Sequence, residues 1–242
     1  MFLGYVNVVK KGGFTLMKQI EKNSVSARNQ LKKESYVTFI QEGGKGKRVM
    51  FVGNSITRHG VLPEIGWLWD WGMAASSIEK DYVHLLVDKI NKIEPDASFC
   101  ICQVADWERE YKNGSECLQA YESARDFEAD IIVFRMIENC PILDFDEAVF
   151  YREYQNLIDY LNPAQKAKII LTTGFWEHAG DDVIIRVAEE RGYPSIYMGE
   201  LGEDDKMKAI GLFEHTGIAN HPGDLGMERI AEMIWEKIKE VI

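Results

Sequence analysis

The stretch VMFVGNSITRHG, residues 49–60, begins with four large apolar residues and stops abruptly at Gly53-Asn54-Ser55. An unbroken apolar run of this kind is typical of a strand that is buried on both faces of a parallel sheet. The stretch therefore predicts a buried strand that ends by presenting Ser55, with Arg58 close behind.

The rest of the chain alternates between short apolar runs and helical patterns. Five β-rich runs are expected to form strands, at residues 48–53, 97–104, 130–136, 167–173 and 194–199. Helices are expected at residues 18–42, 76–93, 115–128, 146–161, 181–191 and 227–238. This order predicts an α/β fold, a three-layer α/β/α sandwich around a five-stranded parallel sheet.

The composition is that of one globular domain, expected at residues 18–242. The chain has 242 residues, 46% of them apolar, which is enough for one substantial core. Its net charge of −11 disfavours nucleic acids and anionic membranes as partners, and no apolar stretch approaches the roughly 20 residues that span a bilayer. The four cysteines lack C-x-x-C spacing and no H-E-x-x-H motif occurs, so no metal site is indicated.

Residues 1–17 are expected to be a leader outside the native coding sequence. Their lysines follow the apolar part and no small-residue cleavage site is present, which argues against a secretion signal. Lys-Gly-Gly at 11–13 can be encoded by a purine-rich ribosome-binding sequence, and Met17 follows after three residues. We therefore expect translation to start at Met17 and the protein to be cytoplasmic. A genuine but frayed leader that starts at Met1 is the alternative.

Polar residues follow several of the expected strands. In a parallel sheet, ligands bind beyond the carboxyl ends of the strands. Ser55 follows the first strand, Asn139 follows the third, and His221 lies in the loop before the last helix. A serine hydroxyl becomes nucleophilic when an imidazole accepts its proton, and the oxyanion that then forms needs fixed donors such as a side-chain amide. These three residues together predict a site for acyl transfer.

Four short blocks, in order along the chain, resemble those of the SGNH hydrolases, the GDSL-type esterase and lipase superfamily. They are Gly53-Asn54-Ser55-Ile56, Trp71-Gly72-Met73, Glu138-Asn139-Cys140 and His221-Pro222-Gly223-Asp224. The resemblance covers residues 48–227 and implies a flavodoxin-like SGNH hydrolase fold whose chemistry needs no cofactor. It implies that Ser55 is the nucleophile and His221 the general base. It also implies that the backbone N–H groups of Ser55 and Gly72 and the side chain of Asn139 hold the oxyanion.

Two positions depart from the family pattern. Asn54 stands where the family usually has aspartate, and Ile218 stands three residues before His221, where the family commonly has the acid of the triad. Either a backbone carbonyl orients His221, which gives a dyad, or another acid does so. The nearby acids are Glu138, Glu214 and Asp224. Asp224 is better interpreted as the N-cap of the last helix.

Trp67, Trp69 and Trp71 alternate within residues 61–73, as expected for an extended segment with three indoles on one side. They are interpreted either as a peripheral core over the edge of the sheet or as a stacking platform for a sugar ring, with Trp67 and Trp71 as its contacts. Further substrate contacts are expected from Arg58, Glu138 and Trp176. For Glu138, contact with Arg135 is the alternative.

The resemblance and the tryptophan-rich loop predict a serine esterase that removes a small acyl group, such as acetyl, from a carbohydrate through a Ser-His acyl-enzyme mechanism. The expected ligand is a small-molecule or oligosaccharide ester. Two alternatives stay open. One is a hydrolase of lipid esters or thioesters, of the lysophospholipase or thioesterase type. The other is a degenerate member that binds glycans without turnover.

Overall fold

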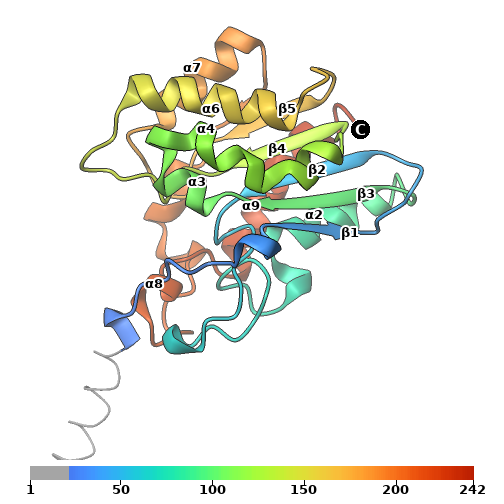
Figure 1. Ribbon diagram of the computed structural model, residues 1–242. Helices are drawn as coiled ribbons and strands as arrows, with labels where there is room; N and C mark the ends of the chain where they lie inside the picture. The colour runs from blue at the N-terminus through green and yellow to red at the C-terminus, as the bar shows by residue number, and fades with distance from the viewer. Residues whose placement is uncertain (1–21) are drawn as a thin grey trace, which may run out of the picture.

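A six-stranded sheet runs through the centre of the molecule, which the computed structural model describes from residue 22 to residue 242 (Figure 1). Its strands lie in the order β1-β3-β2-β4-β5-β6. Their bounds are Val37–Ile40 (β1), Arg48–Gly53 (β2), Ser98–Gln103 (β3), Ile131–Arg135 (β4), Lys168–Thr172 (β5) and Ser195–Ile196 (β6). Neighbouring strands are parallel except β1, which pairs antiparallel with β3. The expected leader, with the start at Met17, lies outside the described residues.

The first strand, β1, was not predicted. A helix was expected at residues 18–42, and over the described part of that range the prediction is wrong, because only residues 22–24 and Lys33–Ser35 are helical. The run Val37–Ile40 consists of β-branched and aromatic residues, which favour a strand, and Val37 stands opposite Cys102 of β3. The three-layer α/β class and the five expected strands are confirmed, but the sheet is mixed and has six strands.

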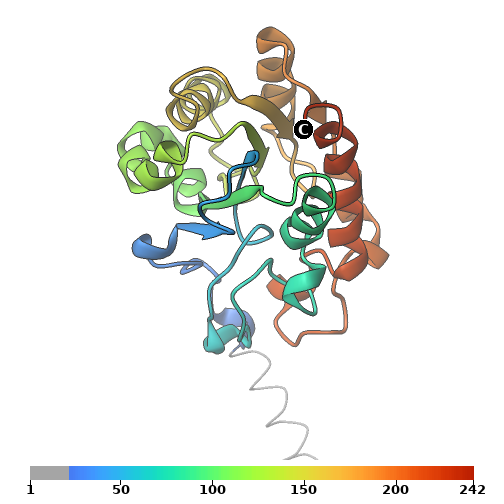
Figure 2. The same ribbon diagram turned by 90° about the vertical axis from the view of Figure 1, so that its right-hand side faces the viewer.

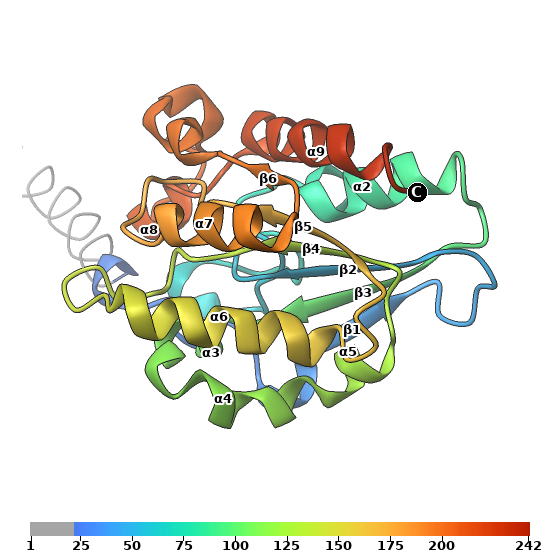
Figure 3. The same cartoon turned by 90° about the horizontal axis from the view of Figure 1, so that it is seen from above.

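Helices cover both faces of the sheet and so form the outer layers (Figures 2 and 3). One face carries α2 (Tyr82–Asn91) and α9 (Asp224–Ile238), which lie side by side. The other face carries α3 (Ala105–Arg109), α4 (Gly114–Cys117), α5 (Glu122–Asp126), α6 (Glu147–Leu161) and α7 (Asp181–Arg191). The helix predicted at 115–128 is broken into α4, a 3-10 turn (Leu118–Tyr121) and α5. Within residues 22–242, no helix is both long enough and apolar enough to cross a membrane.

Burial on both sides explains the apolar run of β2. Met50 and Val52 pack into the core shared with α6 and α7, whereas Val49 and Phe51 pack into the core under α2 and α9. Successive side chains of a strand point to opposite faces, so a strand in the middle of a covered sheet needs apolar residues at every position. Because β2 is central and packed on both sides, the chain is held rigidly on its way to Ser55.

Close backbone contacts fix the chain before α9. The Ala209 N–H donates to the His221 carbonyl, and the Gly223 N–H donates to the Met207 carbonyl, both at 2.9 Å. Gly226, in the first turn of α9, lies so near this segment that a Cβ there would stand 2.2 Å from the Met207 carbonyl oxygen. The glycine therefore allows α9 to approach the loop that carries His221.

We expect Gly226→Ala to destabilise the protein. Alanine is favoured over glycine inside a helix by about 1 kcal/mol, but here its Cβ would collide with a backbone oxygen. The net loss in free energy of unfolding is expected to be about 1–3 kcal/mol, measured by urea denaturation. Glu228→Ala, at an exposed position of the same helix, is the control and should change stability by less than about 0.5 kcal/mol. Equal stability of the two variants would contradict the close contact.

Candidate active site

The structure brings the predicted nucleophile and the predicted base together. Ser55 follows the central strand β2, and His221 lies 166 residues later, between the short helix α8 (Thr216–Ala219) and α9. The Ser55 Oγ and the His221 Nε2 are 2.9 Å apart. At this distance the imidazole is able to accept the hydroxyl proton.

A backbone carbonyl orients the imidazole of His221. The Nδ1 atom lies 2.7 Å from the carbonyl oxygen of Gly217. Because a carbonyl only accepts hydrogen bonds, the proton of the neutral ring lies on Nδ1, and Nε2 is left as the acceptor that faces Ser55. The arrangement is a dyad, which is one of the two alternatives that the sequence left open.

Two of the acids near His221 in the sequence have partners elsewhere. Glu214 accepts from Lys22 at 2.8 Å. Asp224 accepts from the backbone and the hydroxyl of Ser76 at 2.8 Å and from Lys80 at 2.7 Å. Helix α9 begins at Asp224 itself, so the interpretation of Asp224 as the N-cap is wrong. Its carboxylate instead ties α9 to the segment before α2.

Desolvation governs the protonation of His221. Burial lowers the pKa of the ring from its ordinary 6.5 to about 4, although the hydrogen bond to Gly217 acts in the opposite direction. The indole of Trp176, expected as a substrate contact, stands edge-on against this ring with the centroids 5.7 Å apart. His221 is therefore neutral at pH 7, which is the form that accepts a proton.

Three side chains hold the amide of Asn139. Its Nδ2 donates to Glu108 at 2.6 Å. Its Oδ1 accepts from Gln30 at 3.0 Å and from Arg109 at 3.4 Å. Because two donors hold the oxygen end, the nitrogen end is fixed toward Glu108, and one of its two N–H groups remains outside these bonds. An N–H of this kind is what the predicted oxyanion role of Asn139 would need.

The turn that carries Asn139 is strained. Ile137 has a φ of 135°, which β-branched residues rarely adopt, and its side chain is fully buried. Its N–H donates to the carboxylate of Glu108, and its carbonyl accepts from the Cys140 N–H at 2.9 Å. Strain of this kind persists where surrounding contacts determine the backbone, and such positions cluster at functional sites.

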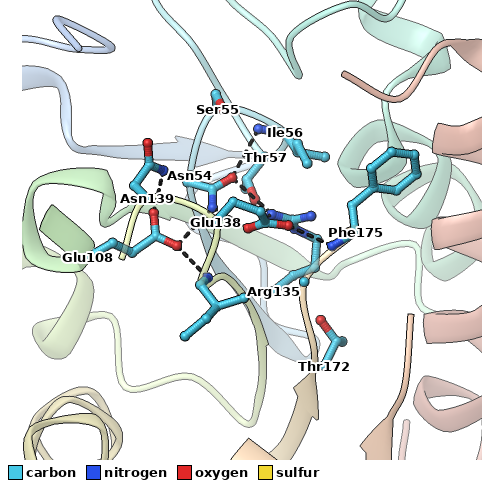
Figure 4. A network of polar contacts seen from close by, with 12 residues as sticks. Asn54, Ser55, Ile56, Thr57, Glu108, Arg135, Glu138, Asn139, Thr172 and Phe175 are labelled. Carbon is cyan, nitrogen blue, oxygen red and sulfur yellow. Dashed lines mark hydrogen bonds and ion pairs between the residues drawn. The ribbon is translucent and has the colours of Figure 1, made fainter. Parts of the chain in front are cut away.

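A buried network of charged and polar side chains lies next to this amide (Figure 4). Asn54 donates to Glu108 at 2.9 Å and to Glu138 at 2.5 Å, and its Oδ1 accepts from Arg135 at 2.9 Å. Arg135 also donates to Glu138 at 2.7 Å. Glu138 therefore pairs with Arg135, the alternative that the sequence left open, and its predicted contact with substrate stays a prediction.

The two carboxylates of this network have opposite pKa shifts. Burial, and then the neighbouring Glu138, raise the pKa of Glu108 to about 7. Burial also acts on Glu138, but Arg135 and the hydrogen bonds from Phe175 and Asn54 outweigh it and lower the pKa of Glu138. The network therefore holds the negative charge of Glu138 beside the guanidinium of Arg135.

Gly72 is not placed to hold an oxyanion. Its N–H donates to the buried carboxylate of Asp81 at 3.1 Å. A Cβ at Gly72 would stand 2.6 Å from the Ile56 carbonyl oxygen, so the glycine serves close packing behind the Ser55 turn. The predicted oxyanion role of Gly72 is therefore wrong. The Ser55 N–H, by contrast, has no acceptor among residues 22–242 and remains available.

The tryptophans form a peripheral core. Trp67 is fully buried, and its ring centroid lies 5.1 Å from that of Trp69 and 6.0 Å from that of Trp71. Arg58, another expected substrate contact, makes a bidentate ion pair with Asp70 at 2.8 Å. Trp71 and Arg58 line a separate, small cavity. The predicted substrate contacts of Trp67, Trp71 and Arg58 are therefore wrong for a site at Ser55.

Ser55, Asn139 and His221 line one cavity of about 610 Å³, called here the serine cavity. Its other lining residues are Ser26, Ala27, Arg28, Asn29, Gln30, Asp106, Arg109, Glu110 and Pro141. Residues 106–110 follow the carboxyl end of β3. Because ligands bind beyond the carboxyl ends of parallel strands, the sequence could have indicated these residues as it indicated Ser55. Gln30 lies in an irregular segment and carries no such signal. Within residues 22–242, no group of His, Cys, Asp or Glu side chains is arranged to hold a metal ion.

Comparison with known proteins shows a likeness in structure. No model of a protein family matches the chain, and no curated protein matches it. A two-domain esterase (CEX) active on acetylated mannans is 18% identical with a TM-score of 0.54, covering 81% of this chain and 49% of that one. The psychrotrophic esterase EstA from Pseudoalteromonas sp. is 12% identical (TM-score 0.53; 80% and 97% covered). The salicylyl-acyltransferase SsfX3 from a tetracycline biosynthetic pathway is 16% identical (TM-score 0.54; 82% and 56% covered).

This chain spans about half the length of the two-domain esterase, with 49% of that protein covered. The chain shares the fold of these three proteins. The structures that share the fold are esterases and an acyltransferase. At 12–18% identity the comparison establishes a shared fold.

Replacing Ile218 by an acid, the residue that the family commonly has at this position, should destabilise the protein without raising its activity. Ile218 is fully buried with Ile65, Trp67 and Met73. We expect Ile218→Asp to lower the free energy of unfolding by about 3 kcal/mol or more, because it buries a carboxylate among apolar groups. It should bring no gain in hydrolysis of p-nitrophenyl acetate. Ile218→Val is the control, with an expected loss of about 1 kcal/mol. A stable, more active Ile218→Asp would show that the acid can reach His221.

The ring of His221 is expected to titrate with a midpoint near pH 4, measured by NMR of isotope-labelled histidine with His221→Asn to identify the signals. The folded pKa lies below the unfolded value of 6.5, so between pH 6.5 and pH 4 the unfolded chain binds more protons. The stability contributed by the neutral ring is therefore lost as the pH falls through this window. A midpoint at the ordinary value would contradict the desolvated site.

Proposed function

We propose that the protein is a serine esterase that hydrolyses a small acyl ester, such as an acetyl ester, on a carbohydrate. The observation that carries the proposal is the 2.9 Å contact between the Ser55 Oγ and the His221 Nε2, with the Asn139 amide lining the same cavity. These are the groups that acyl transfer needs: a nucleophile, a neutral base and a fixed donor.

In the proposed mechanism, the Ser55 hydroxyl attacks the ester carbonyl while its proton passes to the Nε2 of His221. The Gly217 carbonyl, bound to Nδ1–H, stabilises the imidazolium that forms. The Ser55 N–H and the free N–H of Asn139 hold the oxyanion. The imidazolium then protonates the departing alcohol, which leaves the acyl group on Ser55. In the second half, His221 takes a proton from water, the hydroxide attacks the acyl-enzyme, and the carboxylic acid leaves as Ser55 recovers its proton.

The lining of the serine cavity supports a polar substrate with a small acyl group. Ten of its twelve lining residues are polar, and only Ala27 and Pro141 are not. A long acyl chain would find little apolar surface there, whereas hydroxyl groups would find many partners. The likeness to an esterase active on acetylated mannans, at 18% identity, supports the same substrate class.

A lipid ester is the second candidate, because exposed apolar residues follow Pro141, which lines the serine cavity. Pro141 lines the cavity, and Ile142 and Leu143, which follow it, are 67% and 103% exposed. This short apolar tip would suit an acyl chain that lies along the surface. The non-catalytic alternative is weakened, since the imidazole has an orienting partner in Gly217 although Ile218 replaces the usual acid.

Hydrolysis of p-nitrophenyl esters tests the proposal. The wild type is expected to cleave the acetate at least about tenfold faster than the octanoate in kcat/KM. Ser55→Ala should lower kcat/KM on the acetate by about 10³-fold or more, because the nucleophile and its shared proton are lost. Ser123→Ala, at an exposed position on α5, is the control and should retain full activity.

A fluorophosphonate probe gives a second readout for the same variants. It should label the wild type and Ser123→Ala but not Ser55→Ala. A preference for the octanoate would favour the lipid candidate. An intact Ser55→Ala enzyme would refute the assigned nucleophile.

A further inference from the structure

A second cavity, of about 740 Å³, adjoins the serine cavity. The two share Asp106, Arg109 and Glu110, which come from α3 and the residue after it. The second cavity then continues along the 3-10 turn Leu118–Tyr121. Lys33 and Tyr36, in the segment just before β1, also line it. A molecule held at Ser55 therefore meets the second cavity across this shared edge.

The shared edge is held by the protein itself. Arg109 donates to the Arg28 carbonyl at 2.9 Å and to the carboxylate of Asp106. The hydroxyl of Tyr36 donates to the same carboxylate. The Arg109 side chain is only 17% exposed. Because protein contacts already hold these side chains, binding along the edge would cost little ordering of side chains.

Beyond the edge, polar side chains without protein partners line the second cavity. The side chains of Asn113, Glu116 and Gln119 make no hydrogen bond to any other residue between 22 and 242, so their donors and acceptors are available to a ligand. Three carboxylates and two cationic side chains, Lys33 and Arg109, line the cavity, and this balance disfavours an anionic ligand. A volume of 740 Å³ falls within the range of about 300–1,000 Å³ that is usual for ligand sites.

We propose that the second cavity is a subsite for the further sugar units of an acylated oligosaccharide whose acylated unit lies at Ser55. The proposal rests on the function proposed above and extends it from a single acylated sugar to a chain of neutral sugar units. Hydroxyl groups of those units would bind the amides of Asn113 and Gln119 and the carboxylate of Glu116. Contacts so far from the reacting carbonyl supply binding energy that holds the acylated unit in place for attack.

A kinetic comparison tests the subsite. We expect the wild type to prefer O-acetylated mannopentaose over O-acetylated methyl mannoside by about tenfold or more in kcat/KM. Ala120→Trp fills the second cavity from an exposed position and should bring this ratio close to one. Ala148→Trp, exposed on α6 and outside both cavities, is the matched control and should keep the wild-type ratio. If both esters are cleaved and Ala120→Trp leaves the ratio unchanged, the subsite is refuted and the esterase stands.

A protection experiment tests binding without turnover. Cys117 lines the second cavity and is half-buried, whereas the other three cysteines are buried. In Ser55→Ala, saturating mannopentaose should slow the reaction of Cys117 with a thiol reagent by about fivefold or more, because it limits access to the sulfur. The same sugar should give no protection after Ala120→Trp is added, and methyl mannoside should protect little. Protection in a protein whose wild type cleaves no ester would refute the esterase alone. Ester cleavage without protection would refute the subsite alone.

Discussion

The buried amide of Asn54 joins the ends of three strands. It follows β2 directly, and it donates to Glu108, which comes after β3, and to Glu138, which comes after β4. Buried donors and acceptors need partners, so these three loops cannot separate without leaving polar groups unsatisfied. Ser55 is the chain neighbour of Asn54, and Asn139 is the neighbour of Glu138. The relative position of the Ser55 hydroxyl and the Asn139 amide is therefore set by this network rather than by the loops that carry them.

The same network limits how much charge the site can hold. Glu108 and Arg135 are fully buried, and Glu138 is nearly so. Burial, and then the charge of the neighbouring Glu138, raise the pKa of Glu108 to about 7, whereas Arg135 keeps the pKa of Glu138 low. Both oxygens of Glu108 accept from N–H donors, one from Asn54 and Ile137 and the other from Asn139, so a proton on either oxygen would weaken one side of the network.

The elements that depend on local pattern could be predicted from the sequence, and those that depend on distant partners could not. Central strands carry continuous apolar runs, whereas β1 has four half-buried residues at an edge. The candidate nucleophile, base and amide each stand beside a strand end or helix start in a recognisable block. Glu108 and Gln30 act through Asn139 across 31 and 109 residues, a pairing that no local pattern reveals. Gly72 lies in a sequence block that matches the family pattern, but its N–H donates to Asp81. This hydrogen bond could be found only from the folded structure.

The dyad at His221 is consistent with these surroundings. A carboxylate in place of the Gly217 carbonyl would stabilise the imidazolium more strongly and raise the ring pKa. The carbonyl selects the same tautomer without that charge, and the result is a weaker base with a pKa of about 4. In the proposed mechanism, proton transfer to such a base becomes favourable only as negative charge develops on the substrate and is held in place. More of the catalysis then depends on the oxyanion donors, and so on the contacts that fix the Asn139 amide.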